Sequence, residues 1–151
     1  MAIITLGANA ITALPAGVGG KVLQVVTATD STERSTTSTS FVTASNTLSV
    51  SITPSSTSNK IFITSAFEAS AGSGGRSFFT IYRDSTNLGN TNGFFTLLGS
   101  QDGSSGALSV LDSPSTTSAI TYQVYIKSNG VVASMTGNTV KSTITAYEIA
   151  G

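Results

Sequence analysis

The chain has 151 residues, which suits a single domain with one hydrophobic core. Its seven basic and seven acidic residues give a formal net charge of zero, and their scatter excludes nucleic-acid binding as a main activity, because affinity for phosphates needs clustered Lys and Arg. The absence of cysteine and histidine excludes disulfide scaffolds, thiol chemistry, the usual zinc sites and the usual general acid–base catalyst.

Residues 1–20 carry no charged side chain, and the first basic residue is Lys21. A signal peptide needs a basic segment and a continuous apolar run, whereas Pro15 and several polar residues and glycines interrupt this one. The run is also too broken to span a bilayer, so we expect neither a targeting segment nor membrane insertion. We expect instead an assembly and anchoring arm, residues 1–20, that adds a strand to a neighbour's sheet edge. The candidate contacts of this arm are Ile3, Ile4, Leu6, Ile11 and Leu14.

After the arm, the sequence reads as short β-prone segments separated by turn residues, without an amphipathic helix. Alternation is clear at Leu48, Val50 and Ile52, which are separated by hydroxyl residues, and this pattern predicts a strand with one buried face. The expected strands, in chain order, are residues 22–29, 40–44, 48–53, 60–68, 76–83, 94–98, 107–111, 120–127, 131–135 and 140–149.

Turn residues recur at intervals of roughly 8–12 residues, the spacing of a sandwich or barrel. Asn129-Gly130, between two apolar runs, is the strongest hairpin signal in the chain. About ten short strands without a helix predict an all-β fold, an antiparallel β-sandwich of jelly-roll type with an extended N-terminal arm. We expect residues 21–151 to form this sandwich as an oligomerising domain.

The seven acidic residues form no catalytic pattern, because they fall mostly at strand ends or in loops. A glycosidase needs two carboxylates facing each other across a cleft, and nothing in the spacing brings a particular pair together. No calcium-loop pattern is present, although a calcium site built from Asp and backbone oxygens stays open. The sequence therefore predicts a protein that is not an enzyme, with no catalytic residue, no metal ligand and no cofactor.

Aromatic residues cluster at Phe78-Phe79, Tyr82 and Phe94-Phe95. Adjacent residues of a strand point to opposite faces, so one member of each pair lies off the core. That second member either remains on a partly covered outer face or packs on another subunit. We favour the subunit contact, because an exposed aromatic patch on so uncharged a surface would promote aggregation. The candidate assembly contacts are Phe79, Phe94 and Phe95.

Several blocks of the chain resemble a family of small virion surface proteins of tailed phages, especially phages that infect aquatic bacteria. The blocks are residues 20–26, 39–42, 48–61, 111–114, 121–122 and 142–149. They are strand-and-turn patterns rather than catalytic signatures, and the likeness covers about residue 20 to the C-terminus. The resemblance implies a jelly-roll-like domain, often a homotrimer, on the head or tail surface, with its position set by the N-terminus.

The expected function is that of a phage virion structural protein on the particle surface, made in the bacterial host cytoplasm. A trimeric capsid decoration (cement) protein or a compact fibre fits the short chain, with other copies and the major capsid or tail protein as partners. The alternative is a receptor- or glycan-binding adhesin at a tail tip, with a host surface glycan or receptor as partner. Copy number in the particle and sugar binding distinguish these two hypotheses.

Overall fold

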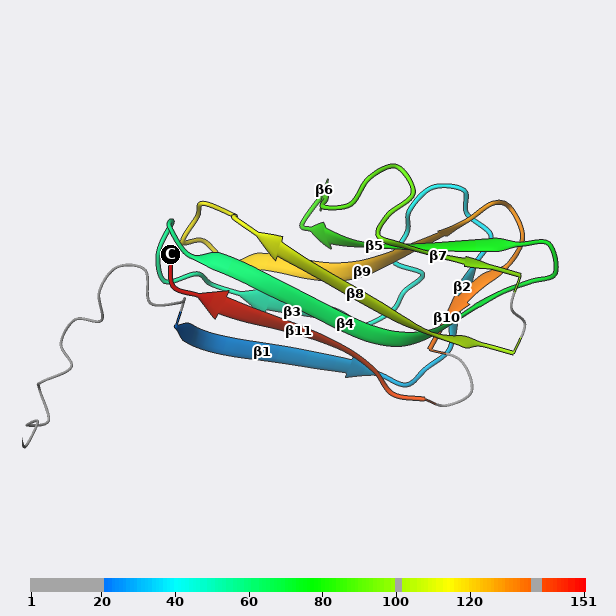
Figure 1. Cartoon of the computed structure of the whole chain (residues 1–151), viewed down its shortest axis with the longest axis horizontal. Helices are drawn as coiled ribbons and strands as arrows, with labels where there is room; N and C mark the ends of the chain where they lie inside the picture. Colours follow the sequence, from blue (N-terminus) through cyan, green and yellow to red (C-terminus); the bar gives the residue numbers. More distant parts are fainter. Residues whose placement is uncertain (1–20, 100–101, 137–139) are drawn as a thin grey trace, which may run out of the picture.

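The computed structural model describes residues 21–99, 102–136 and 140–151, and its regular elements are all strands. None of these residues belongs to a helix that could cross a membrane. The strands are β1 (Val22–Asp30), β2 (Arg34–Thr36), β3 (Ser49–Ile52), β4 (Lys60–Ala71), β5 (Arg76–Arg83), β6 (Thr86–Asn87), β7 (Phe95–Leu98), β8 (Ser104–Asp112), β9 (Ile120–Ser128), β10 (Ala133–Met135) and β11 (Ser142–Ile149) (Figure 1).

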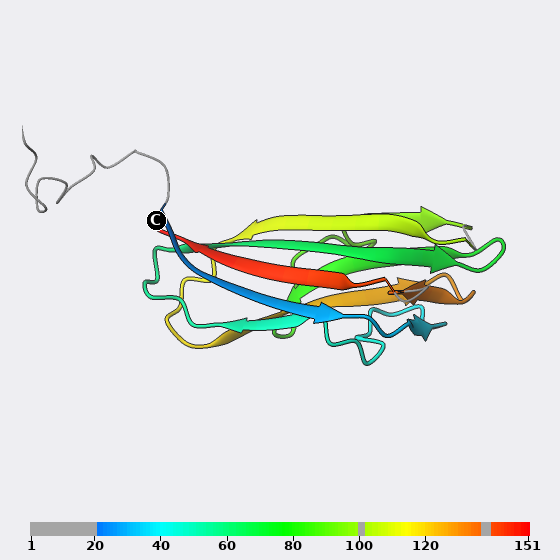
Figure 2. The ribbon, with the colours of Figure 1, turned by 90° about the horizontal axis from the view of Figure 1, so that it is seen from below.

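The strands form two antiparallel sheets. Sheet A has the order β1-β11-β4-β10-β2, and β8 pairs with the opposite edge of β4. Sheet B has the order β3-β9-β5-β6, and β7 pairs with β5 along the same edge as β6. Figure 2 looks across sheet A, where β8, β4, β11 and β1 lie side by side.

The strand order is that of a jelly roll. β1 and β2 follow each other along one edge of the ribbon made by β11 and β10, and β6 and β7 share one edge of β5. We therefore count β1 with β2, β6 with β7, and β10 with β11 as one ribbon each, and number the ribbons in chain order. Sheet A then has the ribbon order 1-8-3-6 and sheet B has the order 2-7-4-5. Two four-ribbon sheets in this order make the double Greek key of a jelly roll, which confirms the predicted fold class. The predicted arm lies outside the described residues.

Some local predictions are wrong. β2 and β6 were not expected, and residues 40–44 contribute only an isolated bridge between Val42 and Ile126 instead of a strand. Asn129-Gly130 makes a turn, with Gly130 at φ 99°, but the turn leads from β9 in sheet B to β10 in sheet A. It is a corner between sheets and not a hairpin, because a turn sequence does not specify whether the strands it joins pair.

The core fills the space between the two sheets. Inward positions alternate with outward ones along β9 and β11, as expected for strands that are buried on one face. Phe67 of β4 and Phe79 of β5 meet across the sheets with ring centroids 4.7 Å apart. The fold therefore leaves the outer faces of both sheets, the loops and the sheet edges as the surfaces available for function.

Candidate functional site

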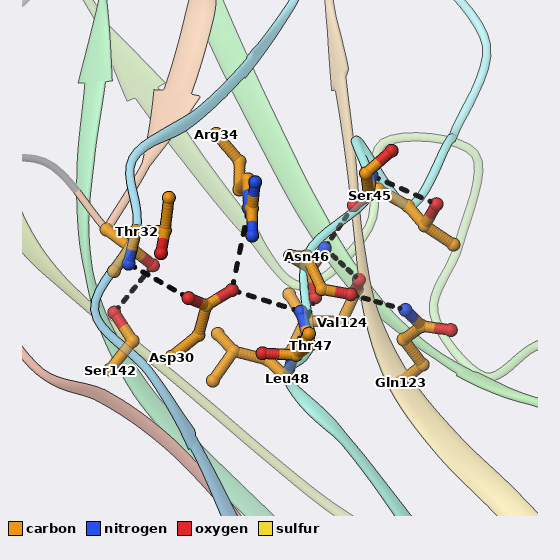
Figure 3. Close-up of polar contacts among 12 residues, drawn as sticks. Asp30, Thr32, Arg34, Ser45, Asn46, Thr47, Leu48, Gln123, Val124 and Ser142 are labelled. Atoms are coloured by element: carbon orange, nitrogen blue, oxygen red, sulfur yellow. Dashed lines mark hydrogen bonds and ion pairs between the residues drawn. The ribbon is translucent and has the colours of Figure 1, made fainter.

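Asp30, at the end of β1, joins two loops to that strand (Figure 3). Its Oδ1 accepts a hydrogen bond from the backbone N–H of Thr32 at 2.9 Å, and its Oδ2 accepts one from Thr47 at 3.0 Å. Arg34 Nε lies 3.7 Å from Oδ2. Burial alone would raise the pKa of Asp30, but the hydrogen bonds from Thr47 and Thr32, with the charge of Arg34, hold it below the usual value. Asp30 therefore positions the chain that leads into β3.

Asn46 continues this network on the other side of the same loop. Its side-chain Nδ2 donates to the carbonyl of Val124 at 3.1 Å, and its Oδ1 accepts from the backbone N–H of Leu48 at 3.0 Å. Its own carbonyl accepts from Gln123 Nε2 at 3.1 Å. These bonds join the loop to β9, so the polar cluster in Figure 3 holds the sandwich together.

Glu148 of β11 is a buried carboxylate held by neutral donors. Its Oε1 accepts from Ser55 N at 2.6 Å, from Ser55 Oγ at 2.8 Å and from Asn59 Nδ2 at 2.6 Å, and its Oε2 accepts from Gln24 Nε2 at 2.6 Å. Burial would raise the pKa of Glu148, but the hydrogen bonds from Asn59, Gln24 and Ser55 outweigh it and lower the pKa to about 2. The anion ties β1 and the β3–β4 loop to β11.

The position of Glu148 could have been found from the sequence. It shares the period-2 face of Ile144 and Ala146, both of which are 0% exposed. A carboxylate on a buried face needs several donors, and the Ser/Thr/Asn-rich residues 54–59 supply them.

Asp112, at the end of β8, connects the two sheets at one end of the sandwich. Arg83 Nη1 donates to both of its oxygens, at 3.0 and 2.8 Å, and the hydroxyl of Tyr122 donates at 2.7 Å. Burial and the neighbouring Asp112 raise the pKa of the Tyr122 phenol. The hydroxyl therefore stays protonated, as its role as donor requires.

A hollow of about 470 Å³ lies beside β4 and β8 and brings Glu68 and Asp102 together with Lys141. The sequence did not reveal this pairing of carboxylates, because the two residues are far apart along the chain. Gly103 is at φ 77°, and a Cβ there would come 2.0 Å from Glu68 Oε1, so Glu68 packs on the Gly103 backbone. Among the residues that the structure describes, no three acidic side chains gather as a metal site would need.

An aromatic cluster covers the outer face of sheet B. The rings of Tyr82 and Tyr125 stack with centroids 3.9 Å apart, and Phe41 meets Tyr82 edge-on at 6.3 Å. Lys127 Nζ lies 4.8 Å from the Phe41 centroid and 5.1 Å from that of Phe78, which is cation–π distance. These five residues, called the aromatic cluster below, come from β5, β9 and the segment before β3.

A row of large apolar side chains crosses the outer face of sheet A. Val25 is the register partner of Tyr147, Tyr147 of Phe62, and Phe62 of Leu111, so the four strands β1, β11, β4 and β8 each contribute one member. Val25 is 54% exposed and Leu111 is 52% exposed. Neighbours in register on one face of a sheet contact one another, so these residues form a continuous strip. We call Val25, Tyr147, Phe62 and Leu111 the apolar row.

The predicted assembly contacts fall in different places. Phe79 is 0% exposed and packs in the core, so it has no surface to offer to another subunit, and its neighbour Phe78 is the outward member of the pair. Phe95 packs on the edge of the core, while Phe94 is 41% exposed. The contacts proposed for the arm, from Ile3 to Leu14, lie outside the described residues.

No family model and no curated protein sequence matches this chain. Among solved structures, the chain is similar to the VP2 subviral particle of infectious bursal disease virus, with 16% sequence identity and a TM-score of 0.47. The match covers 84% of this chain and 37% of the VP2 chain. This chain therefore spans little more than a third of the length of that protein.

Proposed function

We propose that this chain is a structural subunit of a virus particle surface and has no catalytic activity. The observation that carries the proposal is the apolar row, an uncharged strip across β1, β11, β4 and β8. Its end members Val25 and Leu111 are more than half exposed, and its two middle members are partly exposed in the isolated chain. Single exposed apolar residues are normal on a protein surface, whereas a contiguous strip is typical of a surface that binds another protein. A subunit packed against its neighbours has such a surface.

The use of the acidic side chains supports the absence of catalysis. Asp30, Asp112 and Glu148 each accept hydrogen bonds from groups that hold loops or sheets together. A carboxylate that acts as an acid or base must reach a substrate, and these three are occupied by the fold. The resemblance to phage virion surface proteins points the same way, to a capsid decoration protein or compact fibre.

The arm is the proposed anchor to the rest of the particle. Its attachment point is fixed, because Ala150 N donates to the carbonyl of Lys21 at 2.9 Å and β1 begins at the next residue on the edge of sheet A. An uncharged apolar segment that starts at a sheet edge is suited to pairing with an edge on a capsid or tail protein. The proposed oligomer around this anchor is the homotrimer that the resemblance implies.

Particle binding tests the proposal. The purified chain should bind saturably to particles of its own virus from which the native copies have been stripped. A variant that lacks residues 2–16 should keep its β-rich circular dichroism spectrum and lose binding, while the matched full-length variant Leu98→Ser should bind normally. Absence of the chain from intact purified particles would contradict the structural role. Binding by the truncated variant would contradict only the anchoring role of the arm.

The aromatic cluster favours a second candidate function, the binding of a host surface glycan. Partly exposed rings on a sheet face offer apolar area to a sugar ring, and Lys127 adds a polar contact beside them. The chain has no tryptophan, and two of its four tyrosines, Tyr82 and Tyr125, lie in the cluster, so a change in tyrosine fluorescence can detect binding there. If the host polysaccharide binds there, Tyr82→Ala should weaken binding at least roughly tenfold, about 1.4 kcal/mol, and Tyr147→Ala on sheet A should not. No binding by the unchanged chain, or equal losses in both variants, would reject this function.

A further inference from the structure

Two more rows run parallel to the apolar row on the outer face of sheet A. The next outward positions along each strand form a hydroxyl row, and the positions after those form a small row. The hydroxyl row is Thr27, Thr145, Thr64 and Ser109. The small row is Thr29, Thr143, Ala66 and Ala107. All three rows are free of charged side chains, so the centre of the face is neutral, and along β4 and β8 it is graded from large to small residues.

Charged outward residues of β4 stand at the two ends of this face. Lys60 and Glu68 share the outward side of β4 with Phe62, Thr64 and Ala66, in alternation with buried residues. Each is four residues from Thr64, which places them about 13 Å on either side of it. Asp102 and Lys141 lie beside Glu68 around the hollow, so that end carries one net negative charge and the Lys60 end carries a positive one.

This arrangement is complementary to itself under one rotation. Two copies can be placed with the outer faces of their A sheets against each other. A rotation by 180° about an axis midway between these faces, parallel to the hydroxyl row, relates the two copies and reverses the strand direction. The hydroxyl rows then face each other, each apolar row faces the small row of the other copy, and Lys60 faces Glu68. An isologous contact needs this kind of self-matching surface.

We infer that the outer face of sheet A binds the same face of a second copy around this two-fold axis. The inference rests on the proposed function, because it names the subunit contact of a multi-copy structural protein. Large residues above small ones let the two sheets approach, as in the packed layers of a sandwich. Phe62 of each copy comes to Ala66 of the other, which lines the hollow of about 470 Å³, so the hollow receives the Phe62 ring.

The size of the face is adequate for such a contact. Four ribbons about 4.8 Å apart and about nine residues long cover roughly 550 Å² in projection, or about 1,100 Å² for the two copies. This value clears the roughly 1,000 Å² expected of a specific interface and lies just below the usual range of about 1,200–2,000 Å². A neutral centre with opposite charges at its two ends also favours a second copy over a highly charged partner.

Chemical cross-linking tests the axis directly. The chain has no cysteine, so Thr64→Cys introduces a single thiol on the axis, opposite its own copy. Facing sheets lie about 10 Å apart, which a short bismaleimide can bridge. The Thr64→Cys variant should give a covalent dimer. The matched variant Leu98→Cys also carries an accessible thiol, since Leu98 is 63% exposed, but it should give no dimer because Leu98 lies on β7 of sheet B. No dimer from Thr64→Cys, or equal dimer from both variants, would overturn the inference.

A charge exchange tests the orientation. Lys60→Glu should raise the dimer dissociation constant roughly tenfold, because each dimer contains two such contacts. Adding Glu68→Lys to that variant should restore the original value to within about threefold, with the β-rich spectrum of each variant as the control for folding. If the double variant folds but keeps the raised dissociation constant, the antiparallel arrangement is wrong.

Two further results separate this contact from its alternatives. The mass in solution should be an even multiple of the 15.3 kDa chain, so that a trimer built through other surfaces would occur as a pair of trimers. Cross-linking at Thr64→Cys should persist without residues 2–16, and its loss would show that the arm, and not the face, holds the two copies together. Particle binding is not measured in these experiments, so their failure is distinct from failure of the proposed function.

Discussion

Glu148→Gln is expected to lower the free energy of unfolding by about 2–4 kcal/mol, the cost of disrupting a buried, hydrogen-bonded anion. The carboxylate accepts four hydrogen bonds, and an amide in its place turns an NH₂ group toward the donors of Ser55, Asn59 or Gln24. Urea denaturation at pH 7 measures the loss. The matched control is Glu33→Gln, an exposed position at which the change should stay within about 0.5 kcal/mol.

The same carboxylate should make the protein sensitive to acid. The pKa of Glu148 is about 2 in the folded chain, against an ordinary value of 4.5. Because the folded pKa is the lower one, the contribution of Glu148 to stability is complete above about pH 4.5 and is lost as the pH falls toward 2. The thermal midpoint should therefore fall over this window, and less steeply in Glu148→Gln. An equal acid response in both proteins would show that other groups control it.

Phe79→Ala is expected to destabilise the fold by about 3–5 kcal/mol, the usual effect of emptying a buried aromatic site. The Phe79 ring is 0% exposed and lies 4.7 Å from the ring of Phe67 and 5.8 Å from that of Phe95, so its removal leaves a cavity between the sheets. Thermal or urea unfolding monitored by circular dichroism gives the value.

Phe94→Ala is the matched control for this cavity. Phe94 is the same residue type at 41% exposure, and its truncation should cost less than about 1 kcal/mol. A small loss for Phe79→Ala with an altered mass in solution would mean that Phe79 contacts another subunit, as the sequence had suggested, and would contradict its place in the core.

Features that lie within a single strand could be predicted from the sequence. Burial of Leu48, Val50 and Ile52 was evident from alternation, because the period of a strand assigns every second residue to one face. The same period does not say which face is inward. The Phe78-Phe79 pair had to split between the two faces, but the choice of Phe79 for the core depends on packing against Phe67.

Features that need the pairing of distant strands could not be predicted. The apolar row joins positions 25, 62, 111 and 147, and it exists only because the register of three strand pairs aligns them. Register is set by tertiary packing and by the buried faces of all the strands together. For the same reason the hollow that gathers Glu68, Asp102 and Lys141 gave no signal in the sequence.

The position of the C-terminus has a practical consequence for displaying foreign peptides. The backbone N–H of Ala150 donates a hydrogen bond to the carbonyl of Lys21, and the N–H of Gly151 donates to the side-chain oxygen of Asn59. A peptide fused to the C-terminus would therefore emerge beside the proposed anchor, facing the particle. β4 runs from that end for twelve residues, about 40 Å, to the loop of residues 72–75. A Cβ at Gly74 in this loop would meet no other atom within 4 Å, so an epitope inserted there would point outward at the far end of the subunit.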